Sequence, residues 1–117
     1  MKKTIPFELF AKGQTIYFDI LRLAALEELL GDSILQIMRR ADAGVTFVLA
    51  GLTVGLQHEY PQNTRAAVLE KLEQYFETGG TLDEVATPIV RAIVASGIFG
   101  KVDEARKNEE APAKEKS

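Results

Sequence analysis

Two short alternating patterns open the chain. Each places large apolar side chains at every second position: Ile5, Phe7 and Leu9, then Ile16, Phe18 and Ile20. Because successive side chains of a strand point to opposite faces, the two patterns and the glycine-containing segment between them predict a β-hairpin over residues 4–19. An isolated hairpin is marginally stable in water, so we expect helices to cover its apolar face.

After the hairpin, apolar residues recur every three or four positions, which is typical of amphipathic helices. We expect five helices, over about residues 20–30, 33–42, 44–58, 64–78 and 82–96. The third is apolar nearly all round, which predicts a central, buried helix. The fold class is therefore mainly α (α+β), with an N-terminal β-hairpin packed on a bundle of about five helices in a single globular domain, residues 1–100.

Several residues are suited to the ends of these helices. Gly31 follows the first helix and can take the left-handed backbone conformation that often ends a helix. Thr81 and Glu84 have the spacing of a capping box at the start of the fifth helix. Pro88 lies inside that helix and lacks a backbone donor, so we expect a kink near Glu84–Pro88.

Composition excludes several kinds of chemistry. The 117 residues include no cysteine and a single histidine, which excludes disulfides, thiolate metal sites and Cys–His pairs. The net charge of −3 argues against binding nucleic acid by phosphate neutralisation. Residues 101–117 are rich in charges of both signs and have no large apolar side chain after Val102, which predicts a disordered charged tail.

The start of the chain does not resemble a secretory signal, because Pro6 and Glu8 interrupt any apolar run. No apolar stretch approaches the roughly 20 residues that span a bilayer. We therefore expect a cytoplasmic protein that does not bind membranes.

His58 is the one side chain whose ordinary pKa suits proton transfer near neutral pH. Two interpretations of His58 are open. It is a general base that the neighbouring Glu59 carboxylate orients, or it is a polar residue at a helix C-terminus, where a partly charged imidazole interacts favourably with the helix dipole. The other acidic residues considered are Asp19, Glu27, Glu28 and Asp32. They lack the spacing of a calcium loop, and surface solvation is the simpler interpretation. We expect no catalytic residue, no metal and no cofactor.

Two glycines in the third helix, Gly51 and Gly55, form a small-xxx-small pair. Such a pair lets another helix approach closely, from the same chain or from a second copy. No glycine-rich phosphate-binding motif is present in the sequence. We therefore assign the pair to close helix packing.

The last predicted helix has more apolar surface than one contact needs. Beside its main stripe lies a second set of apolar residues, which is a candidate partner-binding face: Ala86, Val90, Val94, Ile98 and Phe99. Either the rest of the fold covers this second set, or part of it contacts a partner. The segment that begins at Thr81 also resembles the first helix of some DNA-binding helix-turn-helix modules. The residues that follow contain a single basic side chain, Arg91, where a recognition helix needs several donors.

The order of these elements resembles the tail assembly chaperones of long-tailed bacteriophages and of prophage-like gene transfer agents. The resemblance covers residues 1 to about 101 and rests on short segments of apolar, glycine and acidic positions: Phe18–Ile20, Ala25–Leu29, Gly31, Ala50–Leu52, Gly79–Thr81, Glu84–Val85 and Ser96–Lys101. Pro88 departs from what the family would have at that place.

The resemblance implies a non-enzymatic role. Proteins of this family act in the host cytoplasm, bind the tape measure protein, assist polymerisation of the tail tube and are absent from the mature virion. It also implies self-association, with the tail-tube protein as a further partner. Two alternatives remain at this point: a small structural or head–tail adaptor protein, and a DNA-binding regulator.

Overall fold

The computed structural model describes residues 3–40 and 43–100, and the predicted tail lies outside them. Within these ranges, five helices accompany a two-stranded antiparallel sheet, which confirms the predicted fold class. The elements follow in the order β1 (Ile5–Pro6), β2 (Thr15–Ile16), α1 (Ile20–Leu30), α2 (Ile34–Arg40), α3 (Val45–Gly55), α4 (Arg65–Glu77) and α5 (Leu82–Ala95). None of these helices is both long enough and apolar enough to cross a bilayer.

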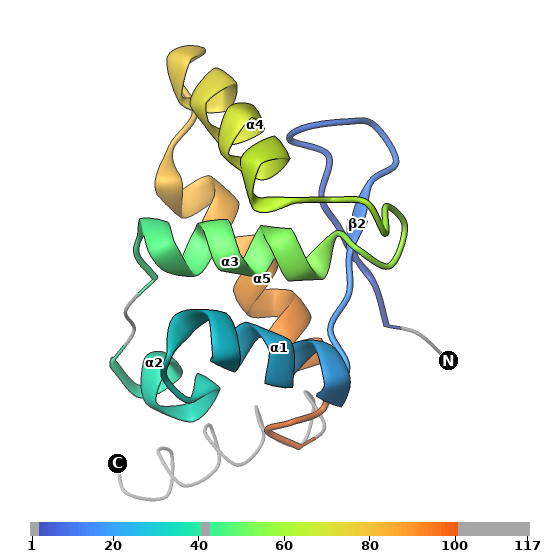
Figure 1. Ribbon diagram of the computed structural model, residues 1–117, viewed down its shortest axis with the longest axis vertical. Helices are drawn as coiled ribbons and strands as arrows, with labels where there is room; N and C mark the ends of the chain where they lie inside the picture. The colour runs from blue at the N-terminus through green and yellow to red at the C-terminus, as the bar shows by residue number, and fades with distance from the viewer. Residues whose placement is uncertain (1–2, 41–42, 101–117) are drawn as a thin grey trace, which may run out of the picture.

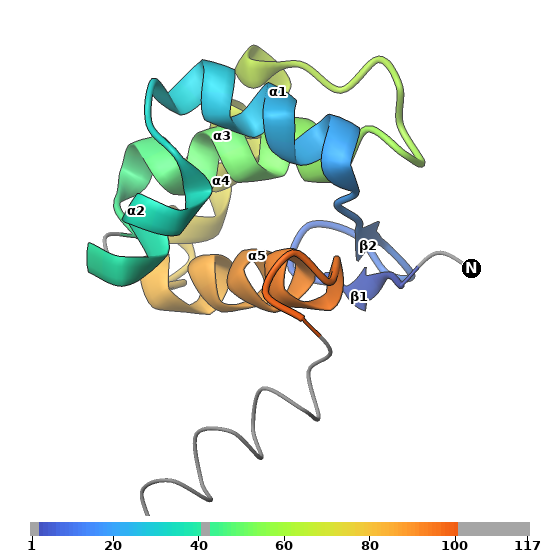
Figure 2. The same ribbon diagram turned by 90° about the horizontal axis from the view of Figure 1, so that it is seen from below.

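Helix α3 lies at the centre of the molecule, as its apolar sequence predicts. It packs against α1, α4 and α5, and Figure 1 shows α4 on one side of it and α1 on the other. Nine consecutive residues, from Phe47 to Gly55, are buried. Figure 2 shows α5 and the hairpin together on the opposite side of the molecule from α1.

The hairpin strands are much shorter than the predicted 4–19. Within the described residues, only Ile5 pairs with Ile16 and Pro6 with Thr15. Pro6 fits this place because the pair it forms with Thr15 is not hydrogen-bonded across the strands: Thr15 N–H donates to Glu59 instead. Phe7 N–H still donates to Gln14 O at 2.7 Å, which closes the base of the loop. The alternation holds for Phe7, Ile16 and Phe18, which are buried, and fails at Leu9 and Ile20, which are exposed.

Local capping sets the helix ends. Asp19 accepts from Arg22 N–H and Thr64 accepts from Ala67 N–H, which satisfies free donors at the first turns of α1 and α4. Gly31 ends α1 at φ 68°, as predicted. Helix α3 ends at Gly55, earlier than the predicted 58, and the Asn63 side-chain amide donates to the carbonyls of Leu52 and Thr53, both at 3.1 Å.

The predicted capping box of α5 is present. Thr81 Oγ1 accepts from Glu84 N–H, and Glu84 Oε1 accepts from Thr81 N–H. Glu84 also accepts from the Tyr75 hydroxyl at 2.8 Å, which joins α4 to α5. The pKa of Glu84 is lowered because its carboxylate accepts hydrogen bonds, first from the Thr81 N–H and then from the Tyr75 hydroxyl. The hydrogen bond between Tyr75 and Glu84 also raises the pKa of Tyr75.

Helix α5 continues through Pro88 without interruption. Proline deprives the Glu84 carbonyl of its usual helical donor. Glu84 is an exposed residue, so water can replace that donor. One residue earlier, the Asp83 carbonyl accepts from Thr87 Oγ1 at 2.9 Å.

Candidate functional site

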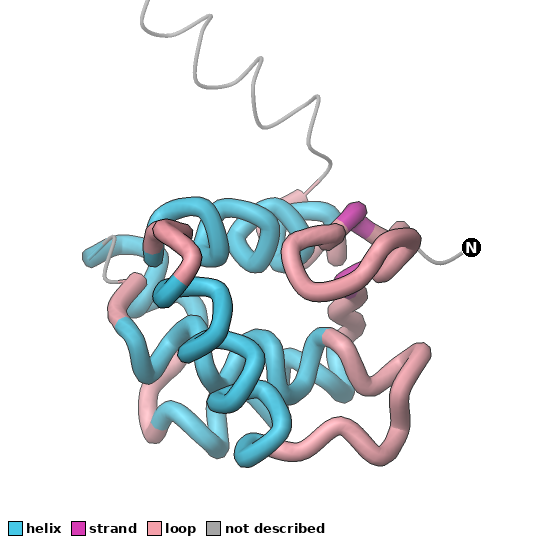
Figure 3. The backbone as a smooth tube through the Cα atoms, turned by 90° about the horizontal axis from the view of Figure 1, so that it is seen from above, coloured by secondary structure: helices cyan, strands magenta, loops and turns pink. Residues whose placement is uncertain are grey.

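An open groove lies between the β1–β2 loop, the α3–α4 loop and one face of α4. Figures 1 and 3 show both loops on the same side of the molecule. The main cavity of the groove has a volume of about 550 Å³. It is lined by Phe10, Ala11, Gln14, Leu56, Glu59, Tyr60, Pro61, Gln62, Asn63, Ala67, Val68 and Lys71.

A second hollow of about 200 Å³ extends the groove along α4. Phe10 and Lys71 line both hollows. The α4 positions that face them run from Ala67 to Thr78, about 16 Å at the helical rise. The groove is therefore long enough for about three turns of another helix.

The walls of the groove are mostly apolar and are held in place. The Phe10 ring packs edge-on against the buried Phe7 ring, with centroids 5.0 Å apart. Val68 and Leu56 are buried and form the floor. Tyr60 stands at the rim with 49% of its surface exposed. Accessible aromatic residues such as Tyr60 are enriched at protein-binding surfaces relative to the rest of a protein surface.

His58 joins the hairpin to the C-terminus of α3, beside the groove. Its Nδ1 lies 3.1 Å from the Gly55 carbonyl and its Nε2 lies 2.8 Å from Thr15 Oγ1. A carbonyl accepts only, so Nδ1 carries the proton and donates to it. Glu59 Oε1 is 3.8 Å from Nε2 and accepts from Thr15 N–H at 3.0 Å. Because each ring nitrogen contacts the protein, this geometry matches the helix-terminus interpretation better than the general base.

Gln14 is a polar residue of the groove that is almost fully buried. Its side chain lines the cavity, and the residue is 9% exposed. Its Oε1 is buried and accepts no hydrogen bond within residues 3–40 and 43–100. A buried acceptor without a donor destabilises a fold by about 1–3 kcal/mol.

The two aspartates named in the sequence analysis, Asp19 and Asp32, have structural partners. Asp19 caps α1 and pairs with Arg22 at 3.0 Å, while Asp32 pairs with Arg40 at 2.6 Å. The Arg22 backbone N–H is the main cause that lowers the pKa of Asp19, and the Arg40 hydrogen bond is the main cause for Asp32.

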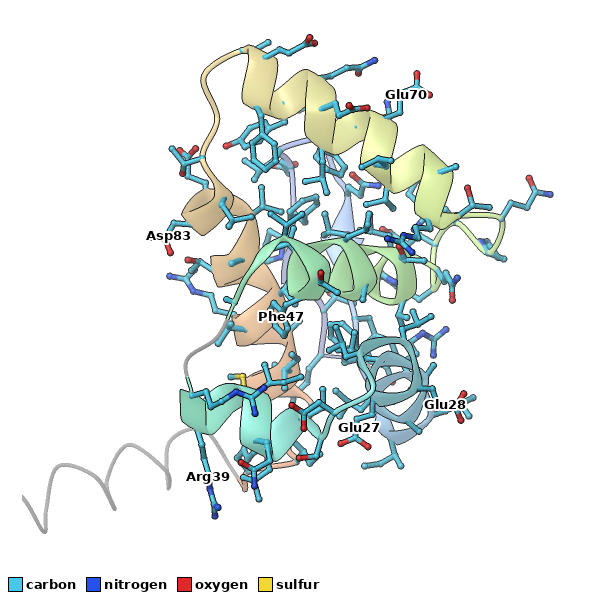
Figure 4. All side chains as sticks on the ribbon, turned by 60° about the vertical axis from the view of Figure 1, so that its left-hand side comes forward. Glu27, Glu28, Arg39, Phe47, Glu70 and Asp83 are labelled. Carbon is cyan, nitrogen blue, oxygen red and sulfur yellow. The ribbon has the colours of Figure 1, made fainter. Side chains whose placement is uncertain are left out.

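Glu27 and Glu28 do not act together. Glu27 Oε2 accepts from Ile34 N–H at 2.9 Å and so connects α1 to the start of α2. Glu28 points away from the molecule in Figure 4. Over the described ranges, no group of three or more His, Cys, Asp or Glu side chains is arranged to hold a metal ion.

The candidate partner-binding face on α5 is only partly accessible. Ala86 is 4% exposed and belongs to the core, which removes it from the reach of a partner in this fold. Val90 and Phe99 are half-buried and pack against the core, and Val94 is also half-buried. Ile98, just beyond α5, is 41% exposed. The residues that remain accessible therefore gather toward the C-terminal end of α5.

The two glycines of α3 have different neighbours. A Cβ on Gly51 would lie 2.8 Å from Cγ2 of Ile89, so this glycine lets α5 approach α3, as predicted. A Cβ on Gly55 would lie 2.8 Å from Cγ2 of Ile16 and 3.1 Å from the Phe18 ring. Gly55 thus makes room for the hairpin and the residues after it rather than for a helix.

Helix α1 presents an apolar ridge that the sequence analysis did not single out. Leu21, Ala25 and Leu29 lie four residues apart on its exposed side, and Leu21 and Leu29 are 77% and 57% exposed. Residues four apart share a helix face, so the spacing of Leu21, Ala25 and Leu29 in the sequence predicts a second apolar face on α1, next to the buried one formed by Leu23 and Leu26. Exposed apolar residues that share one face form a candidate contact surface.

No protein-family model, curated protein or solved structure matches this chain.

Proposed function

We propose that this chain is a non-enzymatic protein-binding module that acts as a phage tail assembly chaperone. Its client is the tape measure protein, and the tail-tube protein is a further partner. It acts in the host bacterial cytoplasm and leaves before the virion is complete. Two observations support the proposal: the resemblance of the sequence to that family, and the groove along α4.

The groove is the observation that supports this proposal. A client-binding protein needs an apolar surface that a partner can reach, and a groove suits an amphipathic helix that lays its apolar face into it. Phe10, Tyr60 and Pro61 supply apolar surface at the rim and Val68 supplies it at the floor. The tape measure protein is long and helical in the family, which makes one of its amphipathic helices the expected occupant.

We also propose that the chain associates with itself through the α1 ridge. The groove and the ridge involve different residues, so a client and a second copy can bind at the same time. This arrangement lets several copies cover one long client. Leu21 and Leu29 are the residues on which that contact depends.

Coexpression with the tape measure protein tests the proposal. Tyr60→Ser removes an exposed aromatic ring from the groove rim, and Leu69→Ser is the matched control because Leu69 is 44% exposed on α4 but does not line the groove. We expect Tyr60→Ser to lower the amount of soluble client by about tenfold, as for a binding hot spot, and Leu69→Ser to leave it unchanged. Equal client solubility with and without this chain would contradict the proposal. Recovery of the chain in virions at stoichiometric amounts would instead favour the adaptor alternative.

A further inference from the structure

The α1 ridge and the groove along α4 match each other in length and in apolar character. Helix α1 has 11 residues and is therefore about 16 Å long, the same as the stretch of α4 that faces the groove. The large side chains of the ridge, Leu21 and Leu29, are eight residues apart, which is about 12 Å. The two hollows of the groove follow one another along α4, so they can receive these two leucines in turn.

Each of the two surfaces also carries one charge without a partner in the part of the chain that the structure describes. On the exposed side of α1 the charged residue is Glu28, which points away from the molecule in Figure 4. The charged side chains that line the groove are Glu59 and Lys71, and Glu59 already accepts from Thr15 N–H. Lys71 lines both hollows, and no acidic residue lies three or four positions from it on α4. The ridge thus presents a free carboxylate and the groove a free cation.

We propose that the groove along α4 receives the α1 ridge of a second copy of this chain, with Glu28 of one copy paired with Lys71 of the next. Helices α1 and α4 pack on opposite sides of α3 (Figure 1), so the ridge does not reach the groove of its own chain. The contact is therefore head-to-tail, because each copy offers its ridge to one neighbour and its groove to another.

This inference rests on the self-association in the proposed function and names the surface that receives the ridge. A copy whose ridge is docked keeps its own groove open, so it can hold a client at the same time. A client that enters an occupied groove must displace the ridge of the neighbouring copy. Client binding and contact between copies therefore compete wherever a groove is already filled.

Exchange of the two charges tests the pairing. Glu28→Lys and Lys71→Glu each place like charges opposite one another, so we expect each to weaken self-association about tenfold in sedimentation equilibrium. The chain with both substitutions has opposite charges again and should recover the association of the unaltered chain. Arg91→Glu is the matched control for the change at Lys71, since Arg91 is exposed on α5 outside both surfaces, and it should leave association unchanged.

A mixture of two variants tests the head-to-tail arrangement. The chain with Leu21→Glu and Leu29→Glu keeps its groove but loses its ridge, whereas the Lys71→Glu chain keeps its ridge but loses the cation of its groove. At a concentration where each is monomeric alone, we expect the equimolar mixture to form dimers and nothing larger, because a single ridge can enter a single groove. A contact between two ridges predicts no complex in this mixture.

Three results would overturn the inference: an unaltered chain that is monomeric at high concentration, a Lys71→Glu chain that associates as tightly as the unaltered chain, or a double variant that does not recover association. These results are distinguishable from failure of the proposed function. Capture of the tape measure protein without recovery in the double variant would overturn the contact between ridge and groove alone. Recovery in the double variant without capture of that client would overturn the chaperone function alone.

Discussion

Thr15 Oγ1 lies 2.8 Å from His58 Nε2, although 43 residues separate the two in the sequence. This hydrogen bond ties β2 to the turn that follows α3. Both segments adjoin the loops that line the groove along α4, so the bond connects its two walls. The groove thus depends on a polar contact between segments that the sequence does not bring together.

Replacing Thr15 with Val tests this contact. The substitution keeps the shape of the side chain but leaves a ring nitrogen of the buried His58 side chain without its hydroxyl partner. We expect the free energy of unfolding to fall by about 1–2 kcal/mol. Urea unfolding measures it, with Thr46→Val as the control, since Thr46 is exposed near the start of α3. Equal effects of the two substitutions would contradict the structural role of the bond.

Gly51→Ala tests the close approach of α5 to α3. The new Cβ would lie 2.8 Å from Ile89 Cγ2, and Ile89 is fully buried, so either the Ile89 side chain or the two helices must shift. Overpacking of this kind destabilises a core by about 1–3 kcal/mol. Gly44→Ala is the control, because nothing lies within 4 Å of its added Cβ. A thermal midpoint that is no lower for Gly51→Ala than for Gly44→Ala would show that the interface adapts freely.

The stability of the fold should depend on Asp19 at acidic pH. The Arg22 backbone N–H and guanidinium lower the pKa of Asp19 below its ordinary value of 3.8. A carboxyl with a lowered pKa contributes stability that is complete above the pKa of the unfolded chain and is lost as the pH falls through the pKa of the folded chain.

Asp19→Asn removes that titration while keeping a side-chain oxygen that can cap α1. We expect the difference in unfolding free energy between pH 6 and pH 3 to be smaller in Asp19→Asn than in the unaltered chain. Urea unfolding at the two pH values measures it. The same pH dependence in both proteins would rule out a contribution from this carboxyl.

Charged substitutions test the α1 ridge. Leu21→Glu combined with Leu29→Glu places two carboxylates on the proposed self-association surface, and we expect the mean particle mass in sedimentation equilibrium to fall to that of a monomer. The thermal midpoint should change little, because both residues are exposed. Leu35→Glu on α2 is the control, with an exposed leucine outside the ridge. A chain that is already monomeric at high concentration would contradict self-association.

The helices could be predicted because their signals are local. Capping residues such as Thr81 and the stripes spaced by three or four residues lie within each helix, and the structure moves the predicted ends by only a few residues. The hairpin was less predictable, since the apolar alternation continues beyond the two residues of each strand that pair.

The groove could not be predicted from sequence in the same way. Its lining comes from the loop around Gln14, the loop around Tyr60 and the face of α4 at Lys71, which meet only in the folded chain. The α5 face was predicted from the number of its apolar residues, but periodicity does not show which neighbour covers them. Ala86 illustrates the difference, because it lies in the core next to the apolar residues that remain accessible.

Mapping of the client contact tests the central claim most directly. Amide and methyl NMR signals of this chain would be followed while a helical peptide from the tape measure protein is added. We predict saturable shifts that concentrate at the groove, at Phe10, Gln14, Tyr60, Val68 and Lys71. Shifts confined to Val94 and Ile98 at the end of α5, or no saturable shift anywhere, would contradict the account.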